Sequence, residues 1–177
     1  MDKHEFAAIV TAILLMFVVA GTAFAIRGDT IGLIEAFVFA FVVVSVPVVS
    51  KKVVAYWLDS SVEHKIWSVE RFGWKPQQKF RREKQFGLFL PLFFTLISLG
   101  AWKVMTLLTY ETRALKHRAA KRFGYYSYTE MTDWQNGVIG AAGIVSLWII
   151  AVVGYLPGWE YLAKLASYYA FWNMLPV

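Results

Sequence analysis

The chain has 177 residues, of which 58 % are hydrophobic and 17 % are charged, and its mean hydropathy is +0.50. Soluble domains usually have about 45–50 % apolar and about 25 % charged residues, so this composition excludes an ordinary soluble domain and predicts a multi-pass protein of the cell membrane. The formal net charge of +6 suits basic loops beside anionic lipid. These basic residues come without a recognisable reading module, so no nucleic-acid partner is expected. The absence of cysteine excludes a disulfide or a thiolate metal site.

Four charge-poor runs predict spanning helices, because about 20 apolar residues cross a bilayer as a helix. They are residues 6–26, 31–50, 86–110 and 134–157. The first run is long for a signal peptide and is expected to be a retained helix. A fifth apolar piece, residues 165–177, is a partial last helix, a re-entrant segment, or the end of a helix that begins near Tyr161. The expected fold is therefore all-α, a single membrane domain over residues 1–177 built as a bundle of four to five spanning helices.

Two basic loops, residues 51–85 and 111–133, separate these runs. The start of the first loop, KKVVAYWLD, can continue the preceding helix beyond the membrane. Residues 61–74 hold β-branched and aromatic residues in partial alternation, a pattern typical of short strands.

The histidines do not form a metal-binding pattern. None of His4, His64 and His117 has a second histidine three or four positions away, which a helical metal pair requires. His64 lies between charged residues and is expected at the surface or the membrane interface. We therefore expect no metal ligand, no catalytic residue and no cofactor.

Small residues in GVIGAAG predict a packing face on the last long helix. Gly137, Gly140 and Gly143 recur at every third position, so they drift slowly around one side of a helix. Small residues let helix backbones approach closely in lipid. These glycines are expected to form the packing seam of the bundle.

Several segments, read in order, resemble site-2 proteases, a family of intramembrane zinc metalloproteases, in their archaeal-type form. TEMTDWQNGVIGAAGIVSL resembles the helix that the family writes E-x-A-L-x-A-A-G-P-x-x-N, and SVEHKIW resembles the strand after its zinc-binding helix. FWNMLPV resembles the start of the N-x-x-P-x-x-x-L-D-G helix, with Asn173 and Pro176 matching. The order and spacing agree over residues 36–177. The resemblance implies a protease-like core with a remnant groove at Gly143, Asn173 and Pro176.

The same resemblance implies that the catalytic motif is lost. With Lys51–Asp59 aligned to the end of the zinc-binding helix, the H-E-x-x-H motif falls on Pro47, Val48 and Lys51. None of these can replace an imidazole ligand or the carboxylate base. A second register, on Ser60, Ser61 and His64, keeps one histidine and still lacks the glutamate.

Two further positions depart from the family. The proline and asparagine of A-G-P-x-x-N are missing after Gly143, and the third zinc ligand would lie beyond Val177. Either the sequence is truncated there or the protein lacks that helix. If the alignment is right, Pro47, Val48 and Lys51 lie close to Asn173.

Two functions follow from these expectations, and a third is less favoured. The first is a catalytically inactive protease-like protein that binds transmembrane segments or other membrane proteins. The second is a structural accessory subunit of a larger membrane complex. The third, an active zinc protease, needs ligands that the sequence does not offer.

Overall fold

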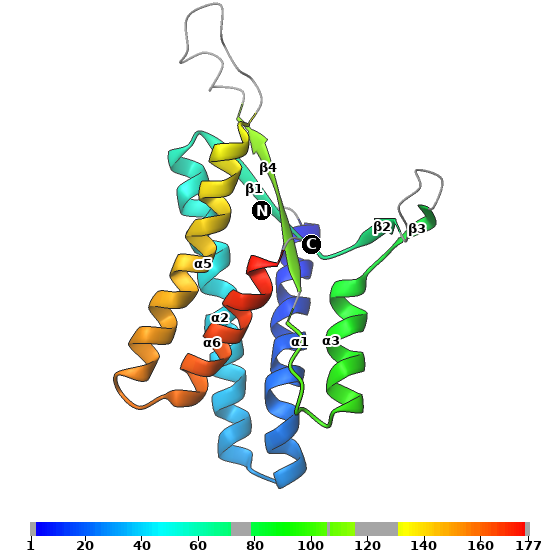
Figure 1. The fold of residues 1–177 in the computed structure, drawn as a ribbon, viewed down its shortest axis with the longest axis vertical. Helices are drawn as coiled ribbons and strands as arrows, with labels where there is room; N and C mark the ends of the chain where they lie inside the picture. Colours follow the sequence, from blue (N-terminus) through cyan, green and yellow to red (C-terminus); the bar gives the residue numbers. More distant parts are fainter. Residues whose placement is uncertain (1–2, 72–78, 106, 116–130, 176–177) are drawn as a thin grey trace, which may run out of the picture. The chain divides into compact units, whose positions relative to one another are not determined.

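The computed structural model describes residues 3–71, 79–105, 107–115 and 131–175. The described part is mostly helical, with short paired strands between the helices (Figure 1). The chain divides into two compact units, one of residues 42–64 and 110–177 and the other of residues 2–41 and 65–109. It passes from one unit to the other within helix α2 and strands β1 and β4.

Helices α1 (Lys3–Arg27) and α2 (Thr30–Trp57) confirm the first two expected helices. Gly28 ends α1 with a φ of +70°, a left-handed conformation that glycine adopts without steric cost. Asp29 Oδ1 then accepts a hydrogen bond of 3.0 Å from the Gly32 N–H and caps the start of α2. Within the unit of residues 2–41 and 65–109, the rings of Phe17 and Phe37 meet edge to face at 5.5 Å.

Helix α2 is longer than the apolar run that predicts it. KKVVAYW continues it to Trp57, so the first expected basic loop begins inside a helix. Strands then follow at β1 (Ser60–Ile66), β2 (Val69–Arg71) and β3 (Lys79–Lys84). β2 pairs antiparallel with β3, and β1 pairs with β4 (Leu108–Ala114). Short strands are therefore present where the alternation of residues 61–74 predicts them.

The third expected helix, residues 86–110, is wrong over its second half. α3 (Phe86–Ile97) has 12 residues, which gives about 18 Å at 1.5 Å per residue against a hydrocarbon core of about 30 Å. Leu99 and Gly100, with φ of 51° and 83°, turn the chain. Within the described residues, three helices rather than the expected four or five are long and apolar enough to cross a membrane: α1, α2 and α5.

Helices α5 (Asp133–Tyr155) and α6 (Glu160–Met174) form an antiparallel hairpin, coloured yellow to red in Figure 1. A capping box starts α5, in which Thr132 and Gln135 each accept a hydrogen bond from the backbone N–H of the other. A Cβ added to Gly154 would lie 3.1 Å from Leu162 Cδ2, so the small residue lets the two helices approach closely. α6 begins at Glu160, one residue before Tyr161. Of the three alternatives for the last apolar piece, this agrees with a helix that begins near Tyr161.

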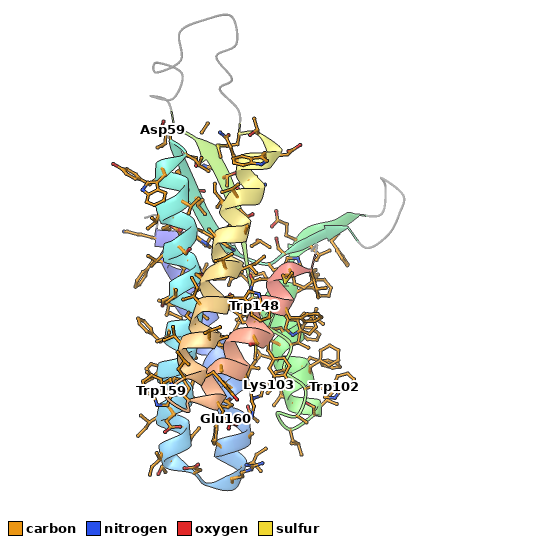
Figure 2. All side chains as sticks on the ribbon, turned by 60° about the vertical axis from the view of Figure 1, so that its left-hand side comes forward. Asp59, Trp102, Lys103, Trp148, Trp159 and Glu160 are labelled. Carbon is orange, nitrogen blue, oxygen red and sulfur yellow. The ribbon has the colours of Figure 1, made fainter. Side chains whose placement is uncertain are left out.

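The hairpin belongs to the same unit as the second half of α2. Ser50 Oγ donates a hydrogen bond of 3.0 Å to the Ala142 carbonyl and ties α2 to α5. A small apolar cluster of Ala55, Val62 and Ile139 joins α2, β1 and α5. Asp59 follows the end of α2, whereas Trp159 and Glu160 lie at the turn of the hairpin, at the opposite end of this unit (Figure 2).

Candidate functional site

A cavity of about 330 Å³ lies inside the unit of residues 42–64 and 110–177. Its wall combines Pro47 and Lys51 from α2, Tyr110 from β4, the α5 residues between Gly137 and Leu147, and the end of α6 at Asn173. The volume is at the lower end of the range for ligand-binding pockets, about 300–1,000 Å³.

Lys51 supplies the charge of this cavity. The residue is only 8 % exposed. Its aliphatic stem lies on the backbone of α5 at Gly143, where an added Cβ would contact Cε and would lie 3.2 Å from Cγ. Its Nζ lies 4.4 Å from the centroid of the Tyr110 ring, a distance typical of a cation–π contact. Lys51 therefore runs from α2 over α5 toward β4.

Tyr110 closes the site from β4. Its hydroxyl donates a hydrogen bond of 3.1 Å to the Asn136 carbonyl. Burial raises the pKa of this phenol above its usual 10.0, because the charged phenolate is poorly solvated there. The phenol is thus neutral at physiological pH. Gly140 makes room for it, since an added Cβ would lie 2.5 Å from the hydroxyl oxygen.

Asn173 enters from the last turns of α6. Its Nδ2 donates a hydrogen bond of 2.8 Å to the Tyr169 carbonyl, four positions earlier in the same helix. Tyr169 is itself buried. The Asn173 side chain is therefore held against its own helix while it lines the cavity.

Four of the residues singled out in the sequence lie around this one cavity: Pro47, Lys51, Gly143 and Asn173. Val48 is buried in α2 but does not line it. Pro176 lies outside the described residues.

The residues of the second alignment that the resemblance allows, Ser60, Ser61 and His64, lie in β1. Ser60 Oγ donates a hydrogen bond of 2.9 Å to the Ala55 carbonyl, and Ser61 Oγ donates one of 3.4 Å to the Arg113 carbonyl. His64 is buried, with 2 % of its surface exposed, so its expected position at the surface is wrong. Alternation along β1 explains the burial, because Ser60, Val62 and His64 all face inward.

The expected glycine seam is only partly formed. Gly143 and Gly140 receive Lys51 and Tyr110 of the same chain, whereas a Cβ at Gly137 would meet nothing within 4 Å. Gly137 and Ala141 are both exposed and line the cavity. Four residues apart on α5, they share one helix face.

The site lacks the chemistry of a metal centre. Over the part of the chain that the structure describes, no three His, Cys, Asp or Glu side chains gather closely enough to hold a metal ion. The group that reaches this cavity from α2 is an ammonium, which repels cations and attracts anions. The arrangement can therefore bind an anionic group beside small, apolar helix surface.

Among the lining residues that sequence reasoning missed, Tyr110 contacts Lys51. It stands at the end of an apolar run that predicts a helix, and its place in β4 depends on pairing with β1, which is distant in sequence. Comparison of the chain with known proteins finds no matching family model, curated protein or solved structure.

Proposed function

We propose that this protein is a multi-pass integral membrane protein, built like a site-2 protease but catalytically inactive, and that it acts by binding transmembrane helices of partner proteins. Its groove, in this proposal, still receives a helix, and the reaction that followed in the family is lost.

The membrane assignment is supported by α1, α2 and α5, which are long and apolar enough to cross a bilayer. Large apolar side chains on them are exposed, including Leu14, Phe41 and Ile149 at 52 %, 53 % and 58 %. Contact with lipid would cover such side chains, whereas water would leave them unfavourably hydrated.

The observation that carries the proposal is the set of residues that line the cavity. Pro47 and Lys51, at the places of the two motif histidines, line the same cavity as Gly143 and Asn173. Two of the three residues that the resemblance assigns to a groove, Gly143 and Asn173, thus line one cavity, and a buried lysine occupies a position where the family needs a zinc ligand. This combination favours a binding role over catalysis.

The exposed face of α5 supports a helix as the bound partner. Gly137 and Ala141 leave the α5 backbone accessible beside the cavity. A small-x-x-x-small pair of this kind lets a second helix pack closely in lipid, where close packing rather than the hydrophobic effect drives association.

Binding can be tested in neutral phosphatidylcholine vesicles with a labelled, uncharged Leu/Ala peptide of about 20 residues, enough to span the bilayer. The chain has no cysteine, so a single cysteine at the exposed Tyr155 accepts the second dye for energy transfer. We expect saturable binding that Ala141→Leu weakens about tenfold, because a loss of about 1.4 kcal/mol of helix packing corresponds to that factor.

Ala7→Leu is the matched control, since Ala7 is also exposed but lies on α1. It should leave the peptide affinity unchanged. Energy transfer that never saturates, or equal weakening by both substitutions, would refute helix binding at this face.

A further inference from the structure

A lysine inside an apolar helix is costly unless it meets an opposite charge or a polar cavity. Lys51 belongs to α2, one of the helices long and apolar enough to span a membrane. It lies six positions before Trp57, the end of that helix, which places it about 9 Å deeper along the axis. Trp57 is itself 77 % exposed, as expected for a residue at the membrane interface.

The described part of the chain places no anion beside the Lys51 ammonium. Among the described residues, the contact that the structure gives Nζ is the Tyr110 ring, and no carboxylate lies within ion-pair distance of it. The Tyr110 hydroxyl is already committed to the Asn136 carbonyl. A lysine ammonium has three N–H donors, so it can form charge-assisted hydrogen bonds to a carboxylate that enters the cavity.

The shape of the site indicates how such a carboxylate arrives. Gly137 and Ala141 expose a small-residue face of α5 at the edge of the same cavity, and a Cβ at Gly137 would meet nothing within 4 Å. A helix packed on this face can insert one side chain toward Lys51. The depth of Lys51 below Trp57 favours a carboxylate held inside the membrane over a lipid headgroup at its surface.

We propose that the Lys51 cavity receives the carboxylate of a single Glu or Asp side chain from a partner transmembrane helix that packs on Gly137 and Ala141. This proposal rests on the helix-binding function and adds its specificity. Lys51 then selects helices that carry one acidic residue about two turns from the end of their apolar stretch, the depth at which Lys51 lies in α2.

The test compares three Leu/Ala peptides that differ at one position, six residues from one end, with Glu, Gln or Lys there. Binding to the full chain is measured in phosphatidylcholine vesicles by the same energy transfer. We expect the Glu peptide to bind about tenfold more tightly than the Gln peptide, a coupling of about 1.4 kcal/mol.

Substitutions at Lys51 and Lys52 test whether Lys51 causes the preference for the Glu peptide. Lys51→Met should abolish the Glu preference and keep the binding of the Gln peptide, which also shows that the variant is folded. Lys52→Met, at the next position and not part of the cavity wall, should retain the preference. Lys51→Glu should reverse it in favour of the Lys peptide.

The outcomes separate the two proposals. Equal binding of the Glu and Gln peptides would overturn the carboxylate site and leave helix binding intact, whereas no binding of either would remove both. A third outcome concerns vesicles that contain 20 mol % phosphatidylglycerol. If this lipid abolishes the preference for the Glu peptide, and if its own binding depends on Lys51, then the cavity holds a lipid phosphate and the inference is wrong.

Discussion

At two glycines of α5, Gly137 and Gly143, substitution by alanine is expected to change the free energy of unfolding in opposite directions. A Cβ at Gly143 would contact Cε of Lys51 and lie 3.2 and 3.3 Å from its Cγ and Cδ, whereas one at Gly137 would meet nothing within 4 Å. Gly137→Ala should stabilise the protein by about 0.5–1 kcal/mol, because alanine loses less backbone entropy in a helix.

Gly143→Ala gains the same helix propensity but must displace the buried Lys51 stem. Overpacking of this kind typically costs about 1–3 kcal/mol, so the net change should be a destabilisation of up to about 2 kcal/mol. The free energy of unfolding can be measured in detergent micelles by denaturant titration with tryptophan fluorescence.

A double substitution identifies the cause. Lys51→Ala removes the stem, so Gly143→Ala in that background should no longer destabilise and should approach the effect of Gly137→Ala. Equal effects of the two glycine substitutions in the wild type, or no rescue by Lys51→Ala, would refute the packing of Lys51 on Gly143.

Three further predictions concern the surroundings of the cavity. Tyr110→Phe removes the hydrogen bond to the Asn136 carbonyl and should lower the free energy of unfolding by about 0.5–1.5 kcal/mol; an unchanged denaturant midpoint would contradict this. Burial raises the pKa of Tyr110 above 10.0, so the folded state holds this proton more tightly, and stability should fall as the pH rises beyond 10.0. This fall should be smaller in Tyr110→Phe, and identical pH profiles would argue against burial of the phenol. Thr132→Ala breaks the capping box with Gln135 and should cost about 1 kcal/mol of stability, with Thr132→Ser as the control that keeps it.

The long helices were predictable because a charge-poor apolar run of spanning length has few alternatives. The error in residues 86–110 has a physical cause. Met105 and Leu107, which lie after α3 and outside any helix or strand, are buried at 0 % and 2 % exposure. Hydropathy does not distinguish a membrane-spanning helix from a non-helical segment that the protein itself buries. The chain turns at Leu99 and Gly100, which both have a positive φ. Gly100 was the one residue in the sequence that could have indicated this turn.

The site was predictable only in part. Pro47, Lys51, Gly143 and Asn173 were singled out by a resemblance, and they line one cavity. The contact between Lys51 and Tyr110 depends on β4 and could not be read from spacing within a helix.

His64 shows the same limit of local reasoning. Its charged neighbours suggested the surface, whereas the period of two along β1 decides which side chains are buried.

We propose that the cavity at Pro47 and Lys51 is a binding site that does not hold a catalytic metal. Elemental analysis of zinc in the purified, detergent-solubilised chain, made without a histidine tag and extensively dialysed, tests it most directly. We expect close to no zinc per chain. About one zinc per chain, retained on dialysis, would contradict this proposal and favour an active zinc protease.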